Sequence, residues 1–531
     1  MNRRSLKYLS DRKKDAEYNS IMFVAALDLG TTGCRTNIFN ISGTIVASDY
    51  QEWESFYPQP SFVEQDANIW WESIKKTIEG AIKKSGIDKS EIVSLSVTNQ
   101  RETIVPVDKE GNPLHNAIVW QDRRTTDQVD YIKKKIGNEK IYKITGLTID
   151  PYFSATKILW FKEKRPNIYQ NANKFLLVSD FIIYKLTGKY FTDQSNASRT
   201  MLFDINKLKY SDEIASSLDL DLDKMPEVVE SGLEIGEINT EDTFFDKKTL
   251  VITGAGDQQS AALGVGVVSP GTIKLTTGTG SFLLAYLEKP NYDPNRRVLC
   301  SCHAIPGAWV QEASIFTTGA FLRWFRDQLG QVECDIAEQQ NLDPYEVITK
   351  EAEKSTIGSN GLIAIPHLVG AGAPNWNPYA KGIIFGLALG HQRRDIARAI
   401  LEGIAFEVKK NVEVFKELGI VPTELRLTGG GSRSELWNQI YADVLGITCV
   451  RNIIEEATSL GAAILAAAGA GLFPDISKSA ESICKVDKKW NPDTNNLDFY
   501  GKLASFSNDL YSFLNEKSFY RKFFDITQLK T

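Results

Sequence analysis

The sequence predicts an α/β fold of two similar domains that face each other across a central cleft. The first observation is a pattern that occurs twice: an apolar β-type run, a turn of Gly and Thr, and a second β-type run. It is found in FVAALDLGTTGCRTNIFN, residues 23–40, and in TIKLTTGTGSFLLAYLE, residues 272–288. The second observation is that strands, helices and further strands follow each copy in a similar order. Together these observations indicate a duplicated domain.

The first copy opens a βββαβ arrangement. FVAALDLG, TNIFN and TIVASDYQ have the composition of a three-strand meander. Ile69, Ile74, Ile78 and Ile82 then recur at helical spacing, and Gly86 is typical of a helix end. The segment VSLSVTN follows as a buried strand. This order of elements is that of an actin-like ATPase (ribonuclease-H-like) domain.

The rest of the chain extends this plan. Residues 124–245 are mixed and helix-rich, and LVITGAGDQQSAALG returns to a strand, a Gly turn and a small-residue helix. After the second copy, the pattern predicts a helix at 314–330, a polar helical insert at 331–356 and a helix at 393–419, then a strand, ELRLTGGG, and a helix at 434–446. SLGAAILAAAGAG predicts a helix packed closely under a nucleotide site. The predicted units are an extension at 1–21, an N-terminal domain at 22–265, a C-terminal domain at 266–505 and a tail at 506–531.

The amino-acid composition excludes several classes of protein. The 531 residues are 42% hydrophobic and 24% charged with a net charge of −6, which indicates a globular protein without a general affinity for nucleic acid. No apolar run approaches the roughly 20 residues that a membrane span needs. Six Cys do not make a disulfide framework, and Cys300 and Cys302 are interpreted as structural thiols. The basic first 21 residues are interpreted either as a solvated tail or as the result of an upstream start codon.

The two Gly/Thr turns predict phosphate binding. Consecutive turn amides form a small cationic concavity, and Thr hydroxyls add donors to it. In the first turn Asp28 precedes Thr31 and Thr32, at the end of a strand where a carboxylate can hold Mg²⁺. The alternative is an Asp that only caps the turn. The second turn contains Gly278 and Thr279, and a third, Gly429–Gly431, stands at a strand-to-helix junction with free amides.

Charged residues at predicted strand ends supply candidates for catalysis and for binding a substrate. Asp257, in GAGDQQS, is a candidate general base for a substrate hydroxyl, because phosphoryl transfer needs one carboxylate to accept that proton. The alternative role is a helix N-cap. Arg101 and Glu102 can pair with vicinal hydroxyls of a polyol, or form a surface ion pair. Trp120 and Tyr152 are candidate walls for a carbon chain, or core aromatics.

At these residues the chain resembles the FGGY family of carbohydrate kinases, from residue 23 to residue 500. YFSATKILWFKEK fits the first family signature except at Lys164, and GIIFGLALGHQRRDIARAILE fits the second throughout. DLGTTGCR, GDQQSAALG and GTGSF are similar to the phosphate and base motifs of the family. NQRET, NAIVWQDRRT and TDQSNASRTML are most similar to the glycerol kinases within it. The segments around Gly430 and SLGAA are more similar to xylulokinases and autoinducer-2 kinases.

The resemblance implies an ATP-dependent, Mg²⁺-requiring kinase of a small polyol or sugar, cytoplasmic and homo-oligomeric (a dimer or tetramer). It implies substrate contacts from Arg101, Glu102, Tyr152, Asp257, Gln258 and Phe282, and the candidate wall residue Trp120 is added to this set. It implies nucleotide contacts from Thr31, Thr32, Arg35, Gly278, Thr279, Gly319, Gly430 and Ser434, with Asp28 at the metal. Ser434 and Arg323 stand where glycerol kinases usually carry Asn and Gln.

The leading hypothesis is phosphorylation of glycerol to glycerol 3-phosphate. The nearest alternatives are a xylulokinase, an autoinducer-2 kinase or another FGGY sugar kinase. Outside this class, a non-catalytic actin-like nucleotide-binding protein would explain the Gly turns but not Arg101 and Glu102. A sugar-binding regulator with an inactive kinase fold would not explain the presence of Asp257.

Overall fold

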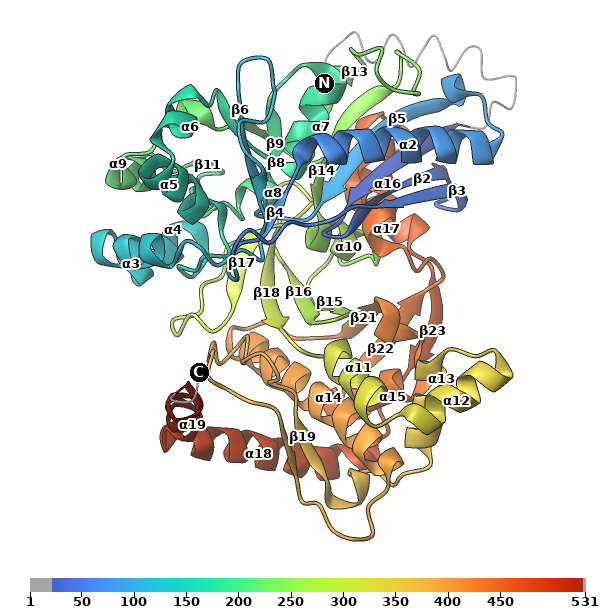
Figure 1. Cartoon of the computed structure of the whole chain (residues 1–531). Coiled ribbons are helices and arrows are strands. Elements are labelled where there is room, and N and C mark those ends of the chain that lie inside the picture. Colours follow the sequence, from blue (N-terminus) through green and yellow to red (C-terminus); the bar gives the residue numbers. More distant parts are fainter. Residues whose placement is uncertain (1–21, 529–531) are drawn as a thin grey trace.

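The computed structural model describes residues 22–528 (Figure 1). The predicted N-terminal extension, 1–21, lies outside the described residues. The first half of the chain, blue to green in Figure 1, forms the upper part of the molecule, and most of the second half, yellow to red, forms the lower part. Each half contains one large mixed sheet.

The first sheet has the strand order β13-β14-β5-β1-β2-β3. The predicted meander, β1 to β3, is antiparallel, β5 and β14 pair in parallel beyond β1, and β13 pairs antiparallel with β14 at the edge. The meander and the buried strand after it are therefore confirmed. The strands are β1 (Phe23–Leu29), β2 (Gly33–Asn40), β3 (Ile45–Glu52), β5 (Ile92–Asn99), β13 (Glu234–Glu237) and β14 (Leu250–Gly256).

The second sheet repeats this plan, with the order β17-β18-β16-β15-β21-β22-β23. Again three strands, β15, β16 and β18, are antiparallel neighbours, and β21 and β22 pair in parallel beyond β15. The duplication predicted from the two hairpins is therefore present in the strand order of both sheets. The strands are β15 (Thr272–Thr277), β16 (Ser281–Leu287), β17 (Leu299–Cys302), β18 (Trp309–Ile315), β21 (Glu424–Thr428), β22 (Thr448–Asn452) and β23 (Val486–Trp490).

Each sheet is covered by amphipathic helices. Helix α2 (Ala67–Ser85) buries Trp70, Ile74 and Ile78 against the first sheet, and its last residue precedes Gly86, whose φ of 67° ends the helix as predicted. Helices α14 (Arg393–Glu417) and α15 (Glu435–Leu445) pack on one another beside the second sheet. The core therefore consists of two sheet–helix layers.

Helix α16 (Ala457–Gly469) follows β22 in the chain but packs on the first sheet, against β1, β5 and β14. Its closest partner is α10 (Asp257–Gly264), the helix that follows β14. Gly264 and Gly461 allow this approach, because a Cβ at either would lie 1.9 Å from a backbone carbonyl oxygen of the other helix. The small-residue helix thus joins the two halves.

Two sequence predictions differ from the structure. The helix predicted at 314–330 begins only at Gly319, because Ser314 and Ile315 complete β18 and pair with Phe282 and Ser281 of β16. The boundary predicted at residue 505 falls inside α18 (Thr494–Glu516), a continuous helix. Cys300 and Cys302, for which no strand was predicted, lie buried on β17.

The remaining elements decorate these two layers. In the first half they are β4 (Glu64–Gln65), β6 (Ile104–Val107), β7 (Ala117–Ile118), α3 (Thr126–Lys135), α4 (Asn138–Thr145), α5 (Ser154–Lys164), α6 (Pro166–Asn171), β8 (Lys174–Leu177), α7 (Val178–Thr187), β9 (Phe191–Asp193), α8 (Gln194–Ala197), β10 (Phe203–Asp204), β11 (Lys209–Tyr210), α9 (Asp212–Leu218) and β12 (Glu227–Val229). In the second half they are α11 (Gly319–Gln328), α12 (Gln331–Gln340), α13 (Pro344–Glu353), β19 (Ile363–Ile365), β20 (Ile383–Phe385), α17 (Ile476–Ile483) and α19 (Phe519–Gln528). Among the helices of residues 22–528, none has the length and apolar character of a membrane span.

Candidate active site

Asp28 lies at the end of β1, directly across the sheet from Arg35 of β2. The hydroxyl of Ser459, on α16, donates to its carboxylate over 3.3 Å. Burial, Asp257 and Glu456 together raise the pKa of Asp28 to about 7. The negative charge here is therefore not neutralised by the surrounding side chains, which is the environment that a cation would stabilise.

The first Gly/Thr turn is held tightly by its neighbours. The carbonyl oxygen of Thr31 accepts hydrogen bonds from Trp53 Nε1 (3.1 Å) and Gln65 Nε2 (2.7 Å). The hydroxyl of Thr31 accepts a third, from Trp120 Nε1, over 2.9 Å. Thr32 is exposed beside it. The turn thus has a fixed shape, and the Thr32 side chain remains accessible to a ligand.

The second turn is closed by backbone hydrogen bonds. Gly278 N donates to Gly280 O over 2.9 Å, and Gly319 N, at the start of α11, donates to Gly278 O over 2.9 Å. A Cβ added at Gly278 would meet only Gly280 O, at 3.8 Å, and one added at Gly430 would meet no atom within 4 Å. A Cβ at Gly319 would instead lie 2.3 Å from Gly278 O. Gly278 and Gly430 therefore border open space of the kind a phosphate needs, and Gly319 packs against the turn.

A pocket of about 260 Å³ is lined by one predicted nucleotide residue, Gly430, and one predicted substrate residue, Gln258. Its walls come from α10, β15, the turn after β21 and the start of α16, and they consist of Gln258, Ala261, Thr276, Thr428, Gly429, Gly430, Arg433, Glu455, Glu456, Ala457 and Thr458. Ser434 does not line it; its hydroxyl accepts from Trp437 N and caps α15. Arg35 lies 3.8 Å from Glu456 and stacks over Tyr50. The pocket thus unites Gln258 and Gly430 but leaves Ser434 outside.

Asp257 is the first residue of α10. Its carboxylate accepts from Gln258 N over 2.7 Å and lies 3.3 Å from Arg101 Nε. The side chain is 31% exposed, whereas that of Arg101 is 2% exposed. Asp257 therefore combines a fixed position with access to a bound molecule, as a general base requires.

Arg101 and Glu102 belong to a buried chain of alternating charges. Arg101 donates two parallel bonds of 2.9 Å each to the Glu312 carboxylate. Arg199 joins the two acids, because its Nε donates to Glu102 (2.6 Å) and its Nη1 to Glu312 (3.2 Å). With Asp257 at one end, the order of the chain is Asp257–Arg101–Glu312–Arg199–Glu102. The surface ion pair considered from the sequence is excluded, because Arg101 and Glu102 are both buried.

The charge states within this cluster differ. Burial raises the pKa of Glu102, although Arg199 and Arg101 oppose this effect. Burial would also raise the pKa of Glu312, but Arg101 and Arg199 lower it to about 2. Glu102 has a φ of 64°, a conformation that a residue with a side chain adopts at a cost in energy. Such strain is typical of residues that a binding site must orient.

The predicted aromatic residues are divided between two places. Trp120 and Tyr152 meet edge to face with ring centres 5.5 Å apart, and the Arg199 guanidinium lies over Tyr152. Lys157, fully buried on α5, supports this pair by donating to the backbone oxygens of Pro151 (3.0 Å) and Tyr152 (2.6 Å). Phe282 lies on β16 and packs against α10 instead.

The structure adds three charged residues that sequence analysis missed. Glu312 and Lys274 lie within the apolar strands β18 and β15, and Arg199 follows α8. Lys274 donates to Gln258 Oε1 over 2.7 Å, and burial lowers its pKa to about 7. A single charge in an otherwise apolar strand was the available signal, because buried charges almost always have partners.

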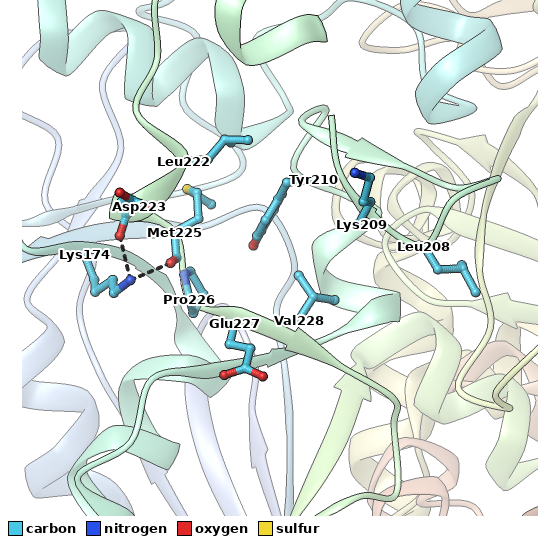
Figure 2. Close-up of a pocket in the computed structure, with 10 residues that line it drawn as sticks. All are labelled: Lys174, Leu208, Lys209, Tyr210, Leu222, Asp223, Met225, Pro226, Glu227 and Val228. Atoms are coloured by element: carbon cyan, nitrogen blue, oxygen red, sulfur yellow. Dashed lines mark hydrogen bonds between the residues drawn. The ribbon is translucent and has the colours of Figure 1, made fainter. Parts of the chain in front are cut away.

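A second cavity, of about 350 Å³, lies elsewhere in the first half (Figure 2). Lys174 crosses one side of it and donates to the backbone oxygens of Asp223 (2.6 Å) and Met225 (2.8 Å). Tyr210 and Val228 line it, as Figure 2 shows, and no residue of the predicted site does. The phosphate turns and charged cluster therefore remain the candidate active site.

Comparisons with known proteins agree with this arrangement. The N-terminal domain model of the FGGY family of carbohydrate kinases matches residues 23–264, and the C-terminal domain model matches residues 273–470. The chain is 40% identical to "Glycerol kinase 1" of Saccharolobus solfataricus over 481 residues, which cover 88% of this chain and 92% of that protein. It is 37% identical to the glycerol kinase of Thermococcus onnurineus over 480 residues, which cover 88% of this chain and 93% of that protein.

Solved structures show the same two-domain fold. Plasmodium falciparum glycerol kinase with ADP superimposes with a TM-score of 0.84 at 28% identity, covering 93% of this chain and 98% of that chain. Ligand-bound xylulose kinase from Lactobacillus acidophilus superimposes with a TM-score of 0.87 at 25% identity, covering 95% of this chain and 100% of that chain. The predicted actin-like (ribonuclease-H-like) α/β fold is confirmed, and the chain belongs to the FGGY family of carbohydrate kinases.

Proposed function

We propose that this chain transfers the γ-phosphoryl group of ATP to a terminal hydroxyl of glycerol and forms glycerol 3-phosphate. The observation that carries the proposal is the position of Asp257. Its accessible carboxylate stands beside Arg101, at one end of the buried charge chain, and close enough to Asp28 to raise the pKa of that residue. A base, a set of hydroxyl partners and a cation-binding carboxylate thus meet in one place.

Glycerol offers three hydroxyls and little apolar surface, so its recognition depends on paired hydrogen bonds. Arg101 supplies donors and Glu102 supplies acceptors, and both are held in place by other charged side chains. Trp120, Tyr152, Gln258 and Phe282 complete the proposed acceptor site. The edge-to-face contact of Trp120 with Tyr152 provides a firm wall for a short carbon chain.

In the proposed reaction, the nucleotide phosphates lie between the turns at 30–32 and 278–280. Thr32, Arg35, Thr279 and Gly430 contact the nucleotide, and Gly319 shapes the second turn. Asp28 would hold a divalent cation such as Mg²⁺, which would neutralise phosphate charge. Within residues 22–528 no cluster of three or more metal-ligating side chains occurs.

Asp257 then accepts the proton of the terminal hydroxyl. The oxygen attacks the γ-phosphorus in line, the bond to the β-phosphate oxygen breaks, and ADP leaves. Lys274 fixes Gln258, the residue after the base, through its 2.7 Å hydrogen bond. Closure of the two halves would exclude water from the reaction.

Another acceptor is the main alternative, because the solved relatives include xylulose and gluconate kinases. We favour glycerol since the curated relatives with 36–40% identity over 88% of the chain are glycerol kinases. The test is ADP release by purified protein with Mg²⁺-ATP and glycerol, xylulose, ribulose, erythritol or a dihydroxypentanedione. Glycerol should have the highest kcat/KM. A tenfold preference for another acceptor would contradict glycerol while retaining the kinase reaction.

We also propose a homo-oligomer located in the cytoplasm. Phe499, Phe506 and Phe513 recur every seven residues on α18, and each is about half exposed. An exposed apolar stripe of this kind is typical of a helix that packs on a partner. Light scattering of the purified protein would measure the oligomeric state, and a monomer at micromolar concentration would contradict it.

A further inference from the structure

Glu312 is the one member of the buried charge chain that comes from the second sheet. It lies on β18, opposite Leu284 of β16, whereas Arg101, Glu102 and Arg199 belong to the first half of the chain. Its side chain is 1% exposed, and its carboxylate accepts three hydrogen bonds, two from Arg101 and one from Arg199. A buried carboxylate with this set of partners is fully ionised, as its pKa of about 2 indicates.

Glu312 engages part of the hydrogen-bonding capacity of Arg101. A guanidinium has five N–H groups, one on Nε and two on each Nη. Glu312 and Gln259 take both N–H groups of Nη1, at 2.9 and 3.3 Å, and Glu312 takes one of Nη2 at 2.9 Å. Within residues 22–528, the remaining donors are one Nη2 N–H and the Nε–H beside Asp257. Glu312 therefore leaves Arg101 with two further donors, of which the Nε–H lies beside the proposed base, Asp257.

Glu312 acts on Glu102 through Arg199. The Arg199 guanidinium lies between the two carboxylates and donates to Oε1 of Glu102. Within the described part of the chain no side chain donates to Oε2 of Glu102, which keeps that oxygen available as an acceptor. Without the Glu312 charge, Arg101 and Arg199 would both be drawn toward Asp257 and Glu102, the acids that the substrate needs.

We propose that Glu312 is a positioning residue for the acceptor substrate. From the second half it fixes Arg101 and Arg199, so that donor and acceptor groups of the first half face the hydroxyls of the polyol. It contacts neither the polyol nor the nucleotide. Acceptor affinity then depends on how the two halves meet. The inference rests on the proposed function, because it takes Arg101 and Glu102 as the groups that bind the polyol.

The test is Glu312→Gln, which keeps the size of the side chain and removes its charge. The acceptor is the polyol that the wild-type protein phosphorylates best, so a wrong choice of glycerol is detected with the wild type. The acceptor KM should rise about 10- to 100-fold, which is the loss expected for charge-assisted hydrogen bonds. The ATP KM should stay within about twofold of wild type. The matched control is Glu288→Gln, an exposed residue just beyond β16, which should change neither KM.

A purely structural role predicts a different result. Loss of packing would lower the melting temperature and kcat and would raise both KM values together, and this outcome overturns the proposal. An unchanged acceptor KM would also overturn the proposal. If Glu312→Gln does not fold, Arg199→Lys tests the same link, because it keeps the charge but cannot bridge Glu102 and Glu312. It should raise the acceptor KM alone, and an acceptor KM within twofold of wild type overturns the proposal. A wild type that phosphorylates no polyol removes the proposed function and this inference together.

Discussion

The indole Nε1 of Trp120 donates a 2.9 Å hydrogen bond to the hydroxyl of Thr31. This bond links a residue of the proposed acceptor wall to the first phosphate turn. The same turn is held through its backbone by Trp53 and Gln65, so it keeps its fold without the Trp120 bond. The proposed acceptor and nucleotide sites are therefore in direct contact through one side-chain pair.

Trp120→Phe should weaken nucleotide binding as well as acceptor binding. Phenylalanine keeps an aromatic wall but releases the Thr31 hydroxyl, and one hydrogen bond contributes about 0.5–1.5 kcal/mol. The ATP KM at saturating glycerol should rise about 2- to 10-fold. Trp71→Phe, in the first half of α2, removes a hydrogen bond to Asp242; it is the control and should leave the ATP KM unchanged. A rise in glycerol KM alone would show that Trp120 serves only as a wall.

Asp257→Asn should lower kcat strongly and change ATP affinity little. The amide keeps the shape of the side chain but cannot accept the proton, so kcat should fall by about 10²–10⁴. The dissociation constant for ATP, measured by calorimetry, should stay within a few-fold of wild type. Asp223→Asn, at an exposed residue of the second cavity, is the matched control. Activity within a few-fold of wild type would remove Asp257 from the role of base.

Gly278→Val should lower ATP affinity without a loss of stability, whereas Gly319→Ala should lower stability. A side chain at Gly278 enters open space, so the protein should keep its melting temperature while ATP affinity falls roughly tenfold or more. A Cβ at Gly319 collides with the backbone of the turn, so that variant should lose stability. Thermal unfolding and nucleotide titration measure the two effects. Unchanged ATP affinity in folded Gly278→Val would show that no phosphate approaches this turn.

Lys157 should give the fold a pH dependence. Burial lowers the pKa of its ammonium group from 10.5 to about 7. Between these values the unfolded chain binds more protons than the folded one, so this group makes stability rise with pH from about 7 to about 10. The unfolding free energy of wild type minus that of Lys157→Met should therefore increase over this range in urea titrations. Lys164→Met, exposed at the end of the same helix, should show a constant difference.

The strands and turns were predictable because local patterns determine them. The Gly/Thr hairpins, the Ile spacing of α2 and the Gly86 cap each depend on a few consecutive residues. The predicted start of the helix at residue 314 was wrong because Ser314 pairs with Phe282, a residue distant in the sequence.

Arg101, Glu102 and Asp257 were identified as candidate site residues from their places at strand ends. Their partners Glu312 and Arg199 were not, since the isolated charge of Glu312 in β18 does not show which residues, more than a hundred positions away, it pairs with.

Ser434 illustrates a different limit. The resemblance placed it among the nucleotide contacts, but in this structure its hydroxyl caps α15. A serine before a helix can fill either role, and only the three-dimensional arrangement decides which. Its nucleotide contact therefore stays a prediction.

The close fit of α10 and α16 has a mechanical consequence. Two helices whose glycines touch the backbone of the opposite helix cannot separate by even a small distance without losing their best packing. We expect any change in the angle between the two halves to occur as a rotation about this helix pair, because a rotation preserves their contact. Asp257 begins α10 and would therefore be displaced little by such a rotation. The proposed base would keep its position, while residues at the outer edges of both halves would move farthest.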